Sequence, residues 1–203
     1  MPSDRPVGAI TVSDPPADPI GDEVLTAAVD GSEAAFSILY RDVQPRLRRY
    51  ASSLVGQDAD DVTAEAWLQI ARDIRTFEGD IDGFRGWTAR IVRNRAFDHL
   101  RATARRPTQL TDVQALLDTP MADSATIALD AISTAEAVEL ISTLPREQAE
   151  AVMLRAVVGL DAARSGEVLG KSATAVRVAA HRGLKTLAKR LATEAVPETT
   201  TQR

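Results

Sequence analysis

Cysteine is missing from this chain of 203 residues, histidine occurs only twice, and aromatic residues make up 4% of it. Without cysteine the chain can form no disulfide, thiolate metal site or cysteine nucleophile, which fits a reducing compartment. The two histidines, His99 and His181, lie far apart, and no Glu-x-x-His pattern or carboxylate pair accompanies them. Metal ligation and acid–base catalysis need such groupings, so we predict no metal, no cofactor and no enzymatic activity.

Long apolar runs are absent as well. No run approaches the roughly 18 residues that span a bilayer, and the N-terminus lacks the basic-then-apolar order of a signal peptide. We therefore expect no membrane insertion and a cytoplasmic protein. No alternating pattern typical of β-strands occurs, although 44% of the residues are hydrophobic. These features predict an all-α fold with one modest core or two small ones.

The first half of the chain predicts a tail followed by helices. Residues 1–21 are expected to be a disordered tail, because five prolines fall within the first 20 positions. From Ser32 the apolar residues recur in steps of three and four, which predicts a helix with one buried face. Pro45 lies inside this pattern and should kink or divide that helix.

Two further helices are predicted before residue 106. Asp58 is a candidate N-cap, with Asp61 three residues on, for a helix whose apolar residues recur every fourth position from Val62 to Ile74. The glycines of TFEGDIDGF then interrupt the pattern, and a third helix should start near Phe84. Residues 22–106 are therefore expected to form the first domain.

Between Pro107 and Pro145 the chain carries acidic residues but no lysine or arginine. Residues 107–130 are predicted to be a flexible acidic linker. Helical periodicity resumes near Ile132, so residues 131–192 should form a second domain, and 193–203 a disordered tail. The predicted architecture is all-α, with two small helical domains joined by a flexible acidic linker.

The second domain contains a helix-turn-helix pattern. Gly170 can adopt the left-handed conformation that ends a helix sharply, and Ser172 is placed to cap the next one. That second helix has an apolar stripe on one side and, on the other, His181, Arg182, Lys185 and Lys189, with Arg177 at the margin. Such a helix suits the major groove of DNA, and a solvated basic face on an ordinary helical hairpin is an equal alternative.

Positive charge is concentrated in RGWTARIVRNRAFDHLRATARR, residues 85–106, which holds seven arginines and one aspartate in a chain of net charge -5. A strand being opened presents phosphates and unstacked bases, which guanidinium and polar or planar groups bind. Asn94 can both donate to and accept from a base edge. Trp87 is expected in the core with Ile91, and Asp98 is expected to pair with a neighbouring arginine. The charge would come from Arg93, Arg95, Arg101, Arg105 and Arg106.

Three runs, taken in order, resemble the extracytoplasmic-function (ECF) sigma factors of the sigma-70 family. They are DADDVTAEAWLQIA, then GFRGWTARIVRNRAFDHLRATARR, and after an acidic linker LPREQAEAVMLRAVVGLDAARSGEVLGKSATAVRVAAHRGLKTLA. The resemblance spans about residues 35–191, nearly the whole chain apart from its tails. Their order and spacing make a chance match improbable.

The resemblance implies a division of labour between the domains. The first would bind the clamp helices of core RNA polymerase and recognise and melt the promoter minus-ten element, with Asn94 and the preceding loop capturing a flipped base. The second, which also meets the polymerase flap, would recognise the minus-thirty-five element. The linker would thread the polymerase channels as a nucleic-acid mimic, or serve only as a spacer. An anti-sigma factor would be a further partner.

The implied site residues fall into three sets. Polymerase binding is assigned to Asp58, Asp61, Glu65 and Gln69. Recognition of the minus-ten element is assigned to Arg93, Asn94, Arg95, Arg101, Arg105 and Arg106. Recognition of the minus-thirty-five element is assigned to Lys171, Ser172, Arg177, His181, Arg182 and Lys185.

Three departures from the family pattern carry expectations. Ala64 replaces the usual glutamine of the clamp-binding run. Arg164, Ser165 and Gly166 replace Glu-Ile-Ala in the first helix of the helix-turn-helix, which suggests looser helix packing, because glycine costs about 1 kcal/mol in a helix relative to alanine. Val178 and Ala179 replace a polar pair, so DNA shape should matter more than base hydrogen bonds.

One rival function is a helix-turn-helix regulator that does not join polymerase, with the first half as a sensing or dimerisation module. The basic segment argues against it. A sensing domain has no need for seven arginines facing single-stranded DNA.

Overall fold

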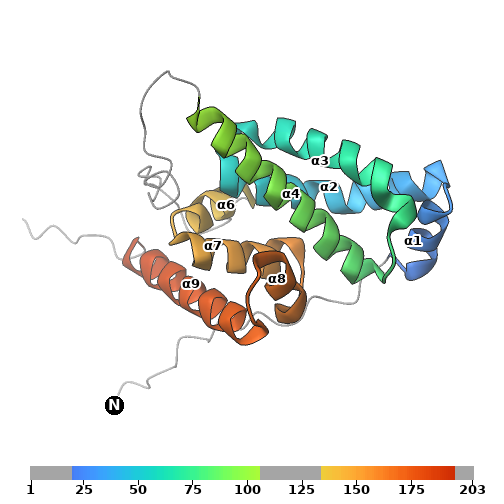
Figure 1. Ribbon diagram of the computed structural model, residues 1–203. Coiled ribbons are helices and arrows are strands. Elements are labelled where there is room, and N and C mark those ends of the chain that lie inside the picture. The colour runs from blue at the N-terminus through green and yellow to red at the C-terminus, as the bar shows by residue number, and fades with distance from the viewer. Residues whose placement is uncertain (1–19, 106–133, 195–203) are drawn as a thin grey trace, which may run out of the picture.

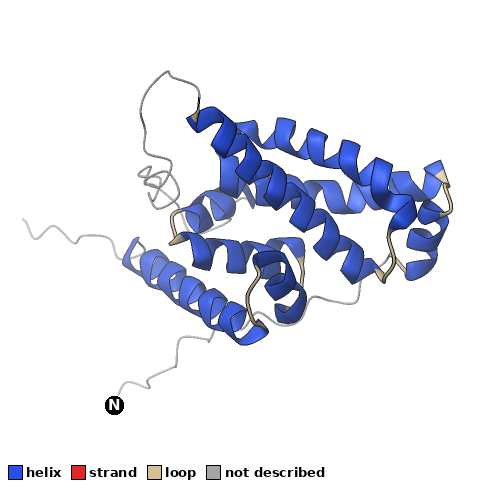
Figure 2. Ribbon diagram, viewed as in Figure 1, coloured by secondary structure: helices blue, strands red, loops and turns tan. Residues whose placement is uncertain are grey.

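The computed structural model describes residues 20–105 and 134–194, and in these two ranges every regular element is helical (Figures 1 and 2). The predicted all-α class is therefore confirmed. The predicted linker, most of both tails, Arg106 and Ile132 lie outside the described residues. No helix in the described ranges is long and apolar enough to cross a membrane.

The first domain is a bundle of three long helices with one short helix at its end. It comprises α1 (Asp22–Val29), α2 (Glu33–Val55), α3 (Ala59–Asp73) and α4 (Ile81–Ala104), with short 3-10 turns η1 (Gly56–Asp58) and η2 (Ile74–Thr76) flanking α3. The side chains of Leu39, Leu47, Ile70 and Phe84 are fully buried between these helices. The periodic apolar positions of the sequence therefore do face the core, as predicted.

Helix α2 is not divided at Pro45, which was one of the two outcomes expected there. It begins after Ser32, whose hydroxyl accepts a hydrogen bond from the Ala35 amide, and it continues through Pro45 as one helix. Pro45 is exposed to solvent. Because water can reach the carbonyl that proline leaves without a donor, the helix is not divided there.

Helices α1 and α4 differ from the sequence-based boundaries. Helix α1 was not predicted, although its Leu25 is buried against α2. Helix α4 begins one turn before Phe84, because the Asp80 carboxylate accepts a hydrogen bond of 2.6 Å from the Gly83 amide. This side-chain cap offsets the low helix propensity of the glycines in the first turns.

The second domain comprises α6 (Thr134–Ser142), α7 (Arg146–Val152), a π-helical continuation η3 (Met153–Val158), α8 (Ala162–Leu169) and α9 (Ala173–Glu194). Gly159 and Gly170 end their helices with φ of 87° and 66°, the left-handed region that glycine tolerates. The Ser172 hydroxyl accepts from the Ala175 amide at 3.2 Å. The predicted helix-turn-helix is therefore present between α8 and α9.

The two domains pack against each other and share one continuous hydrophobic core. Helix α2 contacts both α6 and η3, and α4 contacts α8. Figure 1 shows α6, α7 and α8 lying along α2 and α4, with α9 on the outer side of the second domain. The sequence predicts two domains, and the structure adds a direct contact between them.

Candidate nucleic-acid and polymerase interface

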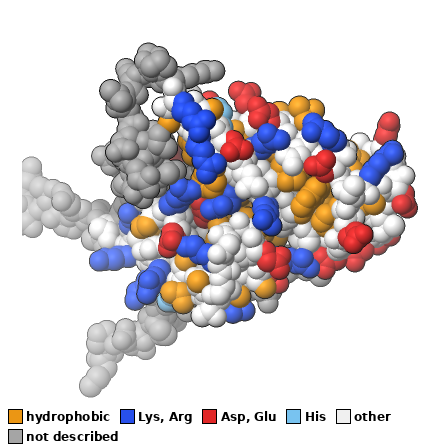
Figure 3. Space-filling view, viewed as in Figure 1, with side chains coloured by type: hydrophobic (Ala, Val, Ile, Leu, Met, Phe, Trp, Pro, Cys, Tyr) orange, Lys and Arg blue, Asp and Glu red, His pale blue; other side chains and the backbone are white. Residues whose placement is uncertain are grey.

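One face of α4 is exposed and cationic. Its residues are spaced four, seven and four apart, so they form a single stripe along the helix. These residues, called here the α4 stripe, are Arg90, Asn94, Arg101 and Arg105, and all are exposed. Figure 3 shows Lys and Arg side chains gathered over the C-terminal half of α4. The stripe can present guanidinium groups to phosphates and one amide to a base.

Arg90 was missing from the sequence-based set. The signal that could have found it is its position four residues before Asn94, which places both on one helix face. Asp98 pairs with Arg101 at 3.1 Å, as predicted. Since both side chains are 64% exposed, the pair can yield to a phosphate at little cost.

Three arginines of the same segment point elsewhere. Arg85 is only 2% exposed, and its guanidinium binds Asp42 at 3.0 Å and Asp82 at 3.3 Å. The expectation that all seven arginines face DNA is therefore wrong for Arg85, which joins α4 to α2. Arg93 turns to the second domain, where its Nε donates to Glu150 at 3.0 Å.

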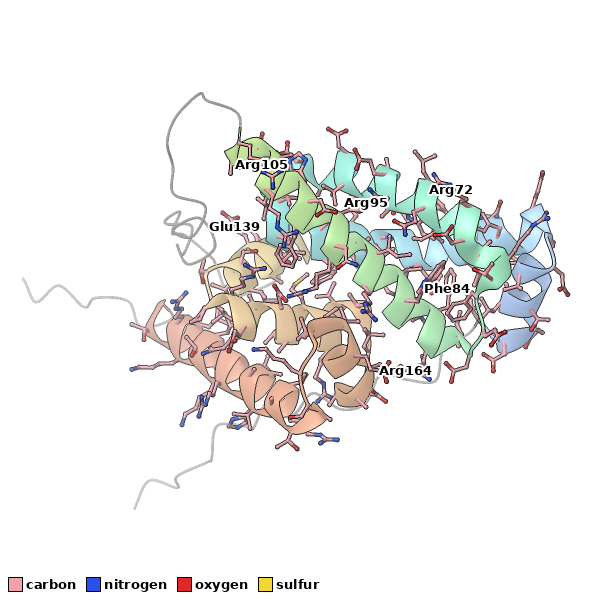
Figure 4. All side chains as sticks on the ribbon, in the orientation of Figure 1. Arg72, Phe84, Arg95, Arg105, Glu139 and Arg164 are labelled. Atoms are coloured by element: carbon pink, nitrogen blue, oxygen red, sulfur yellow. The ribbon has the colours of Figure 1, made fainter. Side chains whose placement is uncertain are left out.

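Arg95 lies on the opposite flank of α4, between α4 and α3 (Figure 4). Its guanidinium donates to the Gln69 side-chain oxygen at 2.8 Å. Gln69 was assigned to polymerase and Arg95 to DNA. Because the two side chains are bonded to each other, the two predicted surfaces meet along the α3–α4 seam.

An aromatic cluster supports the start of α4. The rings of Phe77, Phe84 and Trp87 lie with centroids 5.3 to 5.8 Å apart. Trp87 is half-buried and Ile91 is buried, which agrees with the expected core role for Trp87. The cluster holds the loop before α4 against the helix, so the loop and the α4 stripe keep a fixed relation.

Helix α3 presents a second exposed face. Asp61 and Glu65 are four residues apart and exposed, with Leu68 beside them at 68% exposure. Asp58 behaves differently from the prediction: it stands at the N-cap position, but its carboxylate makes no capping hydrogen bond. It binds His99 of α4 at 2.8 Å, because α4 passes close enough to compete for it.

Asp60 lies in the same turn of α3 as Asp61, but its carboxylate has a partner within the first domain. Arg48 of α2 donates two hydrogen bonds to it, at 2.5 and 3.0 Å. The hydrogen bond and charge of Arg48 lower the pKa of the Asp60 carboxyl. Asp60 is thus engaged by α2, whereas Asp61 faces solvent.

Helix α9 carries the third exposed surface. Val176 and Ala180 are buried and Leu184 is half-buried, so the predicted apolar stripe faces the domain core. The residues on the other side, Arg177, His181, Arg182, Lys185 and Lys189, are all exposed. This set is called here the α9 face. Its cations suit duplex phosphates and base edges in a groove.

Two residues of the minus-thirty-five set lie in the turn before α9 and have partners in the neighbouring helices. Lys171 forms an ion pair with Glu147 of α7, and its hydrogen bond and charge lower the pKa of the Glu147 carboxyl. The Ser172 hydroxyl caps α9. Both residues thus also stabilise the geometry of the turn.

The unusual Arg164-Ser165-Gly166 run makes the packing closer, which corrects the expectation of a looser helix. A Cβ atom on Gly166 would collide with the Lys171 carbonyl oxygen of the turn. Ser165 is fully buried, and Arg164 reaches out to bind Asp80 at the start of α4 (Figure 4). Glycine is needed here because the turn backbone lies against α8.

Within the described residues no group of three or more His, Asp or Glu side chains is placed to hold a metal ion. The chemistry available at these surfaces is that of guanidinium, ammonium and amide groups around exposed helix faces. Such groups bind nucleic acid and acidic or apolar protein surfaces.

Comparison with known proteins places both halves of the chain in one family. The family model described as Sigma-70 region 2 matches residues 39–106, and that described as Sigma-70, region 4 matches residues 134–187. The ECF RNA polymerase sigma factor SigD of Mycobacterium tuberculosis is 30% identical over 174 residues, covering 82% of this chain and 81% of SigD.

Two further proteins are similar. The ECF RNA polymerase sigma factor BldN of Streptomyces coelicolor is 30% identical, and the match covers 85% of this chain and 66% of BldN. The sigma factor RpoE of Bartonella quintana, solved in complex with the anti-sigma factor NepR, has the same fold with a TM-score of 0.58. It is 17% identical, and the match covers 78% of this chain and 98% of RpoE.

Sigma factors are the promoter-recognition subunits of RNA polymerase and not enzymes, which agrees with the absence of catalytic groupings in the sequence. The region 2 match contains the α4 stripe, and the region 4 match contains most of α9. The rival function as a regulator independent of polymerase is not favoured, because it leaves the region 2 match without a role. The chain belongs to the ECF RNA polymerase sigma factors of the sigma-70 family.

Proposed function

We propose that the protein binds core RNA polymerase through α3 and directs it to promoters by recognising two DNA elements, one with each domain. The observation that carries the proposal is the presence of two separate exposed cationic helix surfaces, the α4 stripe and the α9 face. One surface contains an amide suited to an unstacked base, and the other is a helix-turn-helix face. In this proposal residues 22–106 serve the minus-ten element and residues 131–192 the minus-thirty-five element.

The α3 face supports the polymerase contact. Asp61 and Glu65 supply exposed carboxylates and Leu68 an exposed apolar side chain, a mixture typical of the rim and centre of a protein interface. Gln69 can join this contact only by sharing or releasing Arg95. Polymerase binding and the placement of Arg95 are therefore coupled.

We further propose that the protein acts with polymerase in the cytoplasm and that an anti-sigma factor is another partner. The support is the family, in which RpoE of Bartonella quintana is solved with such a partner. The exposed carboxylates and Leu68 of α3 offer a surface for which an inhibitor could compete with polymerase.

Co-elution with core polymerase on a size-exclusion column tests the proposal. We expect the wild-type chain to co-elute and Asp61→Arg to weaken association roughly tenfold or more, because it reverses an exposed charge on α3. Asp60→Asn is the matched control, since that carboxylate is bound by Arg48 within the domain. Equal association of wild type and Asp61→Arg would remove α3 as the polymerase contact.

A further inference from the structure

An apolar side chain lies at the centre of the α9 face. Val176 is fully buried, so the residues two positions before and after it, Thr174 and Val178, point away from the core. The side chain of Val178 is 44% exposed, which makes it the one exposed large hydrophobic residue in the described part of the second domain. A lone exposed valine is ordinary on a protein surface. Its position on this helix is what gives Val178 a candidate role.

Cationic side chains lie on both sides of Val178. Arg177 lies at one margin of the exposed side of α9, and Arg182, one turn after Val178, lies towards the other. When a helix lies in the major groove, its margins are close to the phosphates and its central residues are close to the base edges. The flanking charges therefore favour duplex DNA as the partner of this surface, and they direct Val178 towards the bases.

A valine side chain can recognise one feature of the major groove. It has no hydrogen-bond donor or acceptor, whereas guanine, adenine and cytosine present polar groups there. Thymine alone adds a methyl group, at C5, and apolar side chains contact that methyl group. Opposite the other bases, valine would remove water from a donor or acceptor without replacing its hydrogen bond, which is unfavourable.

We propose that Val178 contacts the 5-methyl group of a thymine in the minus-thirty-five element and gives the second domain its preference for that base pair. This inference deepens the proposed function and rests on it, because it requires α9 to lie in the major groove. Thr174 lies one helical turn earlier, about 6 Å along the helix axis, and is also exposed. Its side chain bears both a methyl and a hydroxyl group, so it extends the surface that faces the bases.

The contact has a predictable size. Burial of one methyl group contributes about 0.8 kcal/mol, which corresponds to about fourfold in affinity. The effect belongs to one base pair, whereas a phosphate contact made by Arg177 would act on every DNA sequence. Loss of Val178 and loss of Arg177 should therefore be distinguishable.

Selection from two pools of duplex DNA tests the contact with the full chain assembled on core RNA polymerase. Each pool carries ten randomised base pairs, with thymine in one pool and uracil in the other. Uracil lacks the 5-methyl group and keeps every hydrogen-bonding group of thymine. We expect the wild type to enrich thymine at one position several-fold and to show no such preference for uracil. Core polymerase alone supplies the background.

Val178→Ala should lose the thymine preference in the first pool. Because the side chain is exposed, the substitution leaves the core intact, and an unchanged circular dichroism spectrum checks this. Arg177→Ala is the matched control on the same helix. It should recover less DNA from both pools while keeping the preference for thymine.

A single duplex then measures the size of the contact. It carries the selected sequence, either unchanged or with uracil in place of the preferred thymine. Fluorescence anisotropy should show that the wild-type complex binds the uracil duplex about fourfold more weakly, as expected for one buried methyl group. The Val178→Ala complex should bind the two duplexes equally. The two substitutions together form a double-mutant cycle on one contact.

Equal enrichment of thymine and uracil by the wild type would overturn the inference, as would a selected element without thymine. Full thymine preference in Val178→Ala would overturn it too. Each of these results leaves the proposed function in place, because a shared element is still selected. Failure of the proposed function gives a different pattern: the chain with polymerase would recover the same DNA as polymerase alone, and the inference would then fall with it.

Discussion

Asn94 stands in the middle of the α4 stripe and is its one uncharged member. The arginines around it attract any phosphate backbone, and this attraction carries no sequence information. An amide offers a donor and an acceptor to a base edge, so it can discriminate between bases. At the scale of single residues, we therefore propose that base preference at the minus-ten element depends on Asn94.

Replacing Asn94 with alanine should impair strand opening and blur preference at one minus-ten base. The expected loss is roughly 1–3 kcal/mol, the value of one good base contact. Permanganate footprinting of a promoter bound by polymerase and the variant measures the opening. Arg90→Ala is the control, since it should lower affinity on all sequences alike. Normal opening with unchanged base preference would reduce the α4 stripe to a charged surface.

The side chains of the basic segment show what the sequence could and could not predict. Helical periodicity correctly places Trp87 near the core, and short-range spacing correctly pairs Asp98 with Arg101. Arg85, Arg93 and Arg95 have the long-range partners Asp42, Glu150 and Gln69, which are 43, 57 and 26 residues away. Such pairings follow from tertiary packing, so a single sequence gives no signal for them.

At the scale of elements, the helix-turn-helix depends on the close approach of the turn backbone to α8. Gly166 lies inside α8, where glycine normally lowers helix stability by about 1 kcal/mol relative to alanine. The turn after Gly170 brings the Lys171 carbonyl against this position, and an added Cβ would collide with it. Helix propensity therefore favours alanine at position 166, whereas packing favours glycine. Packing prevails because an added Cβ would meet a backbone oxygen, which cannot turn aside as a side chain can.

Gly166→Ala should destabilise the protein by about 1 kcal/mol or more, although alanine is the better helix former. The matched control is Gly86→Ala in α4, a buried helical glycine with no atom within 4 Å of an added Cβ. It should be neutral or stabilising by up to about 1 kcal/mol. Urea unfolding followed by circular dichroism measures both. Equal stabilisation by the two substitutions would show that the turn does not press on α8.

The α9 face should act mainly through charge. Arg177→Ala combined with Arg182→Ala should weaken binding to duplex minus-thirty-five DNA and flatten the salt dependence by about one unit of slope for each phosphate that is no longer bound. Fluorescence anisotropy across a series of salt concentrations gives this slope. The double variant should affect strand opening by the α4 stripe only indirectly, because its second domain binds the duplex more weakly. A salt slope equal to that of the wild type would mean that neither arginine meets a phosphate.

At the scale of the whole molecule, two exposed cationic surfaces, the α4 stripe and the α9 face, lie on domains that share one core. The sequence predicts each domain and the turn chemistry of the second, because those depend on local patterns. It does not predict the contact between domains, which includes the binding of Arg164 to Asp80, 84 residues away. When two weak DNA-binding sites belong to one chain, binding of the first raises the effective concentration of the second. Promoter choice should therefore need both surfaces.

The most direct measurement is the mapping of transcript start sites made on genomic DNA by core polymerase with and without the purified protein. We expect new starts that share two upstream elements. With Asn94→Ala, base preference should relax in the nearer element alone, and with the Arg177→Ala, Arg182→Ala double variant, promoters that depend on the farther element should weaken most. Starts identical to those of core polymerase alone, or new starts with no shared upstream element, would contradict a two-element sigma factor.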